Sequence, residues 1–260
     1  MDRSGKKKIL VKIGSNVLTN NTSRISEKKI QDIARQIALL KDRYDFVIVS
    51  SGAIAVAREF VNLESQGKTI KIKQALASIG QPQLMQLFQE NFRKHGLFTS
   101  QCLLSYADFE KEGSRTNIKN TINVLVDHQY IPIINENDTV ATDEIKFGDN
   151  DKLSGLTAAL LQVDLLFIAT NTDGIYTRES INRDQKVTID QTADIPGLQK
   201  QVENSISSQG TGGMATKIQA ADIAQKAGII TLIVNGLKDN FMIDTFENKT
   251  QHTKILPLES

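Results

Sequence analysis

The sequence contains no tryptophan and only one cysteine, four prolines and three histidines among 260 residues. The single cysteine, Cys102, cannot form an internal disulfide; it fits a reducing compartment, and we expect it to be a small core residue. His95, His128 and His252 fall outside every polar cluster, so we expect structural or surface roles for them. These scarcities give no Cys/His metal spacing and suggest no Ser-His-Asp triad.

A charge of one sign and long hydrophobic runs are also missing. The net charge is only +1, so the broad basic surface typical of nucleic-acid binding is absent. No stretch approaches the roughly 18 apolar residues that span a bilayer, and no export signal follows the basic start of the chain. We therefore expect a cytoplasmic protein with small-molecule substrates and with no nucleic-acid or membrane partner.

What the chain does contain is an alternation of short apolar runs and longer periodic segments, which is typical of βαβ units. It predicts strands at residues 9–13, 46–49, 99–104, 131–134, 165–169 and 229–234. Helices are predicted at residues 26–43, 74–94, 114–128, 151–162 and 214–227. We expect an α/β fold, an open αβα sandwich with a mostly parallel central sheet, and a single domain over residues 1–260.

Three segments carry more specific expectations. Ser26 is a plausible N-cap for the first long helix. Gly80 and Pro82 interrupt the segment 74–94, which predicts two helices or a kinked one. Residues 176–209 are polar and lack apolar periodicity, so we expect a hairpin and exposed loops there; a lid and a surface excursion without a role both remain open.

A glycine-rich loop, Gly210-Thr211-Gly212-Gly213-Met214-Ala215-Thr216-Lys217, leads directly into the last predicted helix. Glycines let backbone N–H groups crowd an anion, and a helix start adds its positive dipole end. Lys217 places a cation beside the same spot. The loop lacks the spacing of the Walker A motif, so a phosphate cradle and an ordinary flexible connection both remain open.

Polar and glycine-rich clusters follow five predicted strands, at residues 12–16, 50–53, 135–138, 170–174 and 235–236. In open parallel sheets, ligands bind outside the carboxyl ends of the strands. Convergence of five such clusters on one edge therefore predicts a site. A lysine at the end of an apolar strand, Lys12, must meet water or an anion, because burying an unpaired ammonium is costly.

Acidic and amide residues open the helix predicted at 151–162, in the run Gly148-Asp149-Asn150-Asp151-Lys152. The run lacks the glycine and terminal glutamate of a calcium loop. Asp149 or Asn150 could simply cap the helix. Alternatively, one carboxylate meets a substrate ammonium or Mg²⁺ and the other orients Lys12 and Lys217. For phosphoryl transfer, a carboxylate acceptor would need no histidine base, because its pKa near 4.3 leaves it ionised at neutral pH.

The chain contains five motifs, which are Val11-Lys12-Ile13-Gly14-Ser15, Ser50-Ser51-Gly52-Ala53-Ile54-Ala55, Ile134-Asn135-Glu136-Asn137-Asp138, Lys146-Phe147-Gly148-Asp149-Asn150-Asp151 and the loop 210–217. Together they resemble the glutamate 5-kinase family of the amino acid kinase superfamily, in the same order and from about residue 8 to the C-terminus. The Asn-Glu-Asn-Asp and Gly-Asp-Asn-Asp elements separate this family from carbamate, aspartate and uridylate kinases.

The resemblance implies transfer of the γ-phosphoryl of ATP, with Mg²⁺, to the side-chain carboxylate of L-glutamate, giving L-glutamyl 5-phosphate in the first step of proline biosynthesis. It also implies feedback inhibition by proline and a homo-oligomer, a dimer or tetramer. Another family member acting on N-acetylglutamate or aspartate is an alternative. A non-catalytic nucleotide or amino-acid sensor is a second one, although a sensor need not keep both Lys12 and Lys217.

Site residues are carried over by position. The residues implied for catalysis are Lys12, Lys217 and Asp151. Those implied for glutamate binding are Ser51, Gly52, Ala53, Asn135, Asp138, Asp149 and Asn150. Those implied for ATP binding are Lys12, Gly14, Thr170, Asn171, Thr211, Gly212, Gly213, Met214, Ala215, Thr216 and Lys217. We predict no direct side-chain ligand of a metal.

Two features depart from the family pattern. Asn171 stands where related enzymes often carry aspartate, which affects the contact to the nucleotide. The sequence also lacks the C-terminal PUA domain into which many members continue, so the predicted domain is the kinase domain alone.

Overall fold

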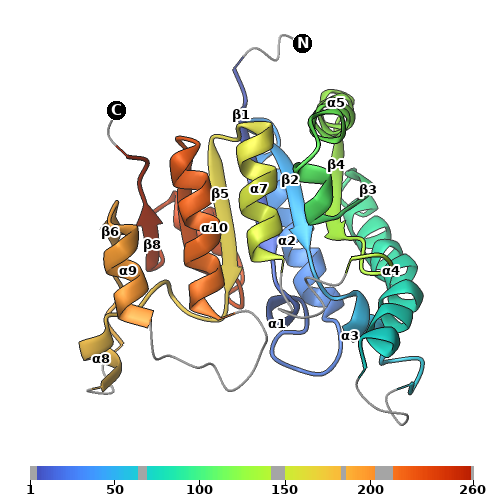
Figure 1. The fold of residues 1–260 in the computed structure, drawn as a ribbon, viewed down its shortest axis with the longest axis horizontal. Helices are drawn as coiled ribbons and strands as arrows, with labels where there is room; N and C mark the ends of the chain where they lie inside the picture. Colours follow the sequence, from blue (N-terminus) through green and yellow to red (C-terminus); the bar gives the residue numbers. More distant parts are fainter. Residues whose placement is uncertain (1–4, 64–68, 142–149, 183–185, 203–212, 259–260) are drawn as a thin grey trace.

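In the computed structural model, one eight-stranded sheet carries helices on both faces (Figure 1). The structure describes residues 5–63, 69–141, 150–182, 186–202 and 213–258. The strand order is β3-β4-β2-β1-β5-β7-β8-β6, and among these described strands only the β7–β8 pair is antiparallel. The strands are β1 (Lys7–Ile13), β2 (Tyr44–Ser50), β3 (Phe98–Leu104), β4 (Tyr130–Glu136), β5 (Leu165–Thr170), β6 (Gln191–Thr192), β7 (Ile230–Asn235) and β8 (His252–Ile255).

The predicted open, mostly parallel αβα sandwich is confirmed. All six predicted strands are present; five are longer than predicted by one to three residues, and β7 is shifted by one residue. Strands β6 and β8 were not predicted. Both are short and lie at one end of the sheet, where β6 is the edge strand and β8 is next to it. The mixed sequence of β8, His252-Thr253-Lys254-Ile255, gives no continuous apolar run.

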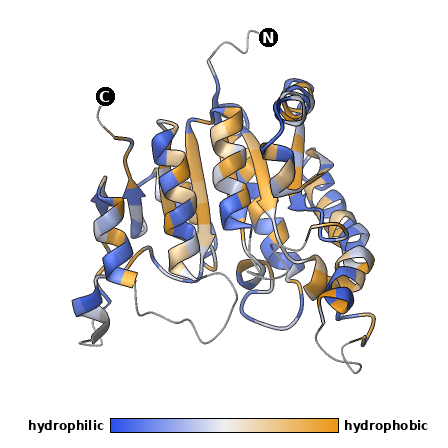
Figure 2. Ribbon diagram, viewed as in Figure 1, coloured by the Kyte–Doolittle hydropathy of each residue, from blue (hydrophilic) through white to orange (hydrophobic). Residues whose placement is uncertain are grey.

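Each face of the sheet has its own hydrophobic core, because successive strand residues point to opposite faces. In β1, Ile9, Val11 and Ile13 join one cluster and Leu10 joins the other. Central parallel strands are buried on both sides and therefore read as apolar runs. Figure 2 shows these apolar strands between helices whose polar residues are interspersed with apolar ones.

Two sets of helices cover the faces. Helices whose side chains join the Ile9 cluster are α1 (Ser15–Leu18), α2 (Glu27–Leu40), α3 (Ala53–Ala57), α4 (Ile70–Arg93) and α11 (Phe241–Phe246). Helices whose side chains join the Leu10 cluster are the 3₁₀ helix η2 (Tyr106–Phe109), α5 (Glu112–Asp127), α7 (Asp151–Leu161), α9 (Ile195–Val202) and α10 (Met214–Lys226). The short α8 (Arg178–Asn182) lies beyond β5 in the chain.

The N-cap predicted for α2 is confirmed, since the Ser26 side chain accepts a hydrogen bond from the backbone N–H of Lys29. Of the two alternatives predicted for 74–94, two separate helices are wrong, because α4 runs unbroken through Gly80 and Pro82; a kinked single helix stays a prediction. Gly80 serves a close helix contact instead. A Cβ at this position would lie 1.8 Å from the carbonyl oxygen of Ala53, so only glycine lets α3 and α4 approach.

The region 176–209 contains more helix than expected. An antiparallel bridge between Tyr176 and Thr188 agrees with the predicted hairpin, but α8 and α9 were not predicted. Ile195 and Leu198 of α9 are buried in the Leu10 cluster, so this part is packed and is not an exposed loop. Residues 183–185 and 203–209 lie outside the described residues.

Two smaller expectations can be compared with the fold. Cys102 is half-buried in the edge strand β3, where it packs against the Leu10 cluster, and burial raises the pKa of its thiol. In the part of the chain that the structure describes, no helix combines the length and apolarity needed to cross a membrane.

Candidate active site

The centre of the candidate site is the carboxylate of Asp151, the first residue of α7, which is completely buried. Its Oδ1 forms an ion pair with Nζ of Lys12, at the end of β1. Its Oδ2 lies 2.9 Å from Nζ of Lys217 and accepts a 2.8 Å hydrogen bond from Oγ1 of Thr216. Strand β1 and helices α7 and α10 therefore meet at one charged cluster.

The electrostatics of this cluster favour an anion. Lys12 is 2% exposed and Lys217 is 7% exposed, so both ammonium groups have lost most of their water. Burial by itself raises the pKa of Asp151, but the charges and hydrogen bonds of the two lysines outweigh it and hold that pKa well below its ordinary value. The carboxylate is thus ionised throughout the neutral range, and the three groups carry a net positive charge.

Two features of the backbone bring the chain close to this charge. A Cβ on Gly14 would lie 3.5 Å from Nζ of Lys12, so glycine leaves open space beside the ammonium. Helix α10 begins after Gly213, which has no side chain that could cap the helix. Lys217 lies in the first turn of α10. A helix N-terminus next to a lysine attracts phosphate.

A second, uncharged cluster lies beside Asp151 and is organised by Asn150. Its Nδ2 donates to the carbonyl oxygen of Ser50 at 2.8 Å and to Oδ1 of Asn135 at 2.7 Å, and lies 3.2 Å from Oγ of Ser51. Asn150 occupies the N-cap position of α7, but its side chain makes no capping hydrogen bond. Simple helix capping is therefore not its role; the side chain joins the carboxyl ends of β2 and β4.

The ends of β2 and β4 supply the remaining substrate-site residues predicted from the sequence. Ser51 is buried, and its N–H donates to the carbonyl oxygen of Ile13. Gly52, with a φ of 113°, is the N-cap of α3, which begins at Ala53. Asp138 lies just beyond β4, and burial raises the pKa of its carboxyl to about 6.

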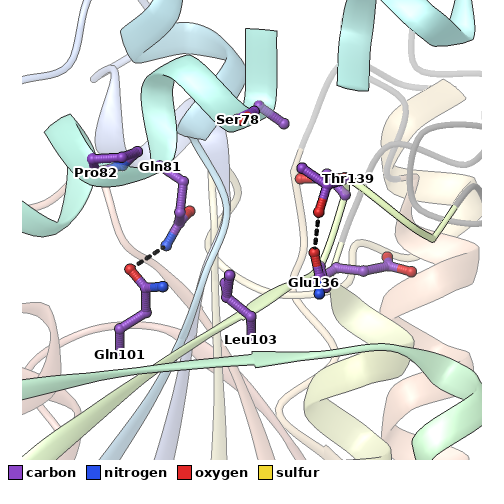
Figure 3. A pocket seen from close by; sticks show the side chains of 10 residues that line it. Ser78, Gln81, Pro82, Gln101, Leu103, Glu136 and Thr139 are labelled. Atoms are coloured by element: carbon purple, nitrogen blue, oxygen red, sulfur yellow. Dashed lines mark hydrogen bonds between the residues drawn. The ribbon is translucent and has the colours of Figure 1, made fainter. Parts of the chain in front are cut away.

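A hollow of about 170 Å³ opens next to Asp138, between α4 and the ends of β3 and β4 (Figure 3). Gln81 reaches from α4 toward Gln101 on β3, with Thr139 and Glu136 on the opposite side in this view. The wall is a mixture of amide, carboxylate and small apolar groups.

The ends of β5 and β7 form a third part of this edge. Thr170 closes β5, and its hydroxyl lies 3.4 Å from Oδ1 of Asn171. Beyond it, Asp173 accepts a hydrogen bond from Nδ2 of Asn235 at 3.0 Å and pairs with Lys238. Hydrogen bonds and the ion pair lower the pKa of Asp173 although partial burial acts to raise it.

The structure thus brings most of the predicted site residues to one edge of the sheet. Asp151 touches Lys12, Lys217 and Thr216, and Asn150 touches Ser51 and Asn135. The predicted site residues Asp149, Thr211 and Gly212 lie outside the described residues. His95, His128 and His252 touch none of these groups; the two contacts described for a ring nitrogen are to backbone carbonyls, from His128 and His252.

Sequence reasoning missed Gln81, which belongs to the polar cluster through Asn135. One local signal was available, because glycine inside a helical pattern indicates close packing and Gln81 follows Gly80. That signal does not identify the partner of Gln81, since Gly80 packs against Ala53 of α3.

The residues present fit a phosphorylated nucleotide better than a metal cage. No group of three or more His, Cys, Asp or Glu side chains among the described residues could hold a metal ion. Asp151 has both oxygens occupied by lysine and threonine partners. Magnesium usually keeps several waters and binds through substrate phosphates, so the positive cluster fits phosphates that bring the ion with them.

Residues 7–235 match the model of the Amino acid kinase family. The chain belongs to this family. It is 42% identical over 261 residues to the glutamate 5-kinase of Vibrio vulnificus strain YJ016, covering 97% of this chain and 67% of the relative. It is 41% identical over 254 residues to the glutamate 5-kinase of Photorhabdus laumondii, covering 97% of this chain and 69% of the relative.

Two solved structures of the family fold superimpose on nearly the whole chain. Carbamate kinase from Giardia lamblia bound to AMP-PNP gives a TM-score of 0.69 at 15% identity, over 98% of this chain and 99% of that one. UMP kinase from Ureaplasma parvum gives 0.65 at 17% identity, over 96% and 99%. At these identities the likeness establishes the fold. Family membership rests on the match over residues 7–235, and ATP is the phosphoryl donor that this family uses.

Proposed function

We propose that this enzyme transfers the γ-phosphoryl group of ATP to the side-chain carboxylate of L-glutamate and releases L-glutamyl 5-phosphate and ADP, the first step of proline biosynthesis. The observation that carries the proposal is the buried Asp151 carboxylate that holds Lys12 and Lys217 together, directly beside the amide cluster of Asn150. The relatives at about 40% identity, named glutamate 5-kinases, support the choice of substrate.

The proposed chemistry needs charge and position, and it needs no base. An oxygen of the glutamate carboxylate attacks the γ-phosphorus, and the bond from that phosphorus to the bridging oxygen of ADP breaks. The acceptor carries no proton at neutral pH. Lys12 and Lys217 would stabilise the negative charge on the transferring group, and Asp151 would keep the two ammonium groups in place. Mg²⁺ would enter on the phosphates and neutralise part of their charge.

Two sets of residues would bind the substrates. Glutamate would be held by Ser51, Gly52, Ala53, Asn135, Asp138, Asp149 and Asn150. In this set, Asp138 would contact the α-ammonium. ATP would be bordered by Gly14, Thr170, Asn171 and residues 211–217. The position of Gly14 beside Lys12 and of Thr216 beside Asp151 supports the phosphate end of this assignment.

The remaining predictions concern the whole chain. We propose that residues 1–260 act as one kinase domain, that the enzyme forms dimers or tetramers, and that proline inhibits it. Size-exclusion chromatography with light scattering measures the oligomer, and addition of proline to the assay measures inhibition.

A substrate panel tests the proposal. Purified enzyme with Mg-ATP is assayed for ADP release with L-glutamate, N-acetyl-L-glutamate and L-aspartate, each with and without proline. Glutamate-dependent ADP release, with hydroxylamine trapping of an acyl phosphate, is the expected result. Turnover only with N-acetylglutamate or aspartate would assign another activity of the family, and nucleotide binding without turnover on any acceptor would indicate a sensor.

A further inference from the structure

Four carboxamide side chains form a continuous chain from the candidate catalytic centre to the hollow under α4. Asn150 Nδ2 donates to Asn135 Oδ1 at 2.7 Å, and Asn135 Nδ2 donates to Gln81 Oε1 at 2.8 Å. Gln81 Nε2 lies 3.5 Å from Gln101 Oε1 at the far end (Figure 3). The first three side chains are at most 8% exposed, whereas Gln101 is exposed.

Backbone groups fix which carboxamide donates and which accepts at each hydrogen bond of this series. The carbonyl oxygen of Ser50 can only accept, so Asn150 must turn its NH₂ group toward it. The N–H of Glu136 can only donate, and it donates to Oδ1 of Asn135 at 2.9 Å. Asn135 must therefore turn its NH₂ group toward Gln81, and Oε1 of Gln81 accepts the hydrogen bond.

The direction has a consequence at the substrate end. With Nδ2 of Asn150 committed to Ser50 and Asn135, its remaining polar atom is Oδ1, an acceptor. This buried oxygen has no hydrogen-bond partner among the described residues. A buried acceptor is costly unless a donor reaches it. Phosphates and ionised carboxylates offer no donor, but an α-ammonium group does.

We propose that Gln81 is a positioning residue that, through Asn135, fixes Asn150 with its oxygen as an acceptor for the α-ammonium of the amino-acid substrate. This inference rests on the proposed function and deepens it. Gln81 itself stands one residue further from the substrate than Asn135, so it acts through its neighbour. Its oxygen satisfies an amide that would otherwise be buried without a partner.

The test compares Gln81→Met with Gln81→Glu and with Gln101→Met. Methionine keeps the length of the side chain but offers Asn135 no good acceptor. Glutamate keeps an acceptor oxygen at the same place. Gln101→Met removes only the long outer contact, so it is the matched control at the same hollow. Kinetics with glutamate and ATP, and inhibition by glutarate, which is glutamate without its ammonium group, are measured for each.

For Gln81→Met we expect the KM for glutamate to rise about tenfold, the value of one hydrogen bond to a buried amide. The KM for ATP and the inhibition constant of glutarate should stay within about twofold, because neither ligand offers an ammonium at this point. Gln81→Glu should retain most of the affinity, and Gln101→Met should behave as the unmodified enzyme.

Three results would overturn the inference. An unchanged KM for glutamate in Gln81→Met would remove the positioning role. An equal loss for glutamate and glutarate would show that the ammonium is not the group recognised. An equal loss in Gln81→Met and Gln101→Met would indicate general loosening of the hollow. Absence of glutamate-dependent turnover in the unmodified enzyme would instead overturn the proposed function, and this inference with it.

Discussion

The two halves of the site solve different problems with different chemistry. The half around Asp151 is ionic: two buried ammonium groups share one buried carboxylate. The half around Asn150 is neutral: its carboxamides hold one another and the backbone of β2 and β4. The halves meet at consecutive residues, Asn150 and Asp151, so the first turn of α7 joins them.

The difference shows how each half gains its selectivity. An excess of positive charge attracts any phosphate, and it tolerates small changes in position because Coulomb attraction falls slowly with distance. A carboxamide distinguishes hydrogen-bond donors from acceptors on a ligand by turning either its oxygen or its NH₂ group toward it. That orientation depends on every hydrogen-bond partner in the carboxamide series. The ionic half is therefore suited to binding and stabilising the phosphoryl group, and the amide half to choosing the acceptor.

Removal of a charge should produce the largest effect. We expect Lys217→Ala to lower kcat about 100-fold or more, because one of the two cations next to the transferring phosphoryl is lost. Lys226→Ala is the matched control: Lys226 lies on the same helix α10 but is exposed, and among the described residues it pairs with Asp222 at the surface. Steady-state kinetics measure kcat, and circular dichroism monitors folding.

The same pair of variants can also contradict the division of the site into an ionic half and an amide half. If Lys217→Ala raised only the KM for glutamate at unchanged kcat, the lysine would belong to acceptor selection, and the division into an ionic and an amide half would be wrong.

The pH dependence of glutamate use should show the next largest effect. Burial raises the pKa of Asp138 to about 6, so its charge is lost as the pH falls through that value. If the ionised form binds the α-ammonium, kcat/KM for glutamate should fall about tenfold per pH unit below the pKa. At pH 7.5, Asp138→Asn should lower kcat/KM by roughly 10- to 100-fold, the range for a charged hydrogen bond.

The sign of the effect on stability is opposite. Ionising a carboxyl with a raised pKa costs free energy in the folded state, and this cost is present above pH 6 and disappears as the carboxyl is protonated. Asp138→Asn should therefore be at least as stable as the unmodified protein at pH 7.5 in urea denaturation. If Asp138→Asn were less stable than the unmodified protein, the assigned role of Asp138 would be wrong. The same holds if kcat/KM for glutamate of this variant still fell at pH values below 6.

The sequence predicted well which strand ends come together, because parallel strands carry a simple rule. Strand ends such as Lys12 and Ser51 must lie at one edge of the sheet, whatever the details of packing. The charged cluster was also accessible, since a lysine after an apolar strand requires a counterion. Its partner, Asp151, follows from the family motif.

What the sequence could not give is the direction of the amide half. Gln81 and Asn135 are 54 residues apart, and no local pattern couples a helix to a strand end at that distance. The orientation of each amide depends on backbone groups, the carbonyl of Ser50 and the N–H of Glu136, whose positions follow only from the register of β2 and β4. Helix α9 was missed for a related reason: two buried side chains, Ile195 and Leu198, suffice to hold it, and they make too short a pattern to recognise.

Loss of the Thr216 hydroxyl in the ionic half should give the smallest effect. The hydroxyl of Thr216 lies 2.8 Å from Oδ2 of Asp151 and 2.8 Å from the carbonyl oxygen of Gly213. Thr216→Val removes the hydroxyl and keeps the shape, while Thr216→Ser keeps the hydroxyl. Because Asp151 retains both lysines, we expect Thr216→Val to lower kcat only about fivefold, below the range for losing a hydrogen bond to a charged group, and Thr216→Ser to remain within twofold. Thr216→Val and Gln81→Met should then differ in the kinetic constant that changes. Loss of the contact to Asp151 should change kcat, and loss of the contact to Asn135 should change the KM for glutamate. A Thr216→Val variant with normal kcat and a raised KM for glutamate would show that orientation, and not charge alone, governs the ionic half as well.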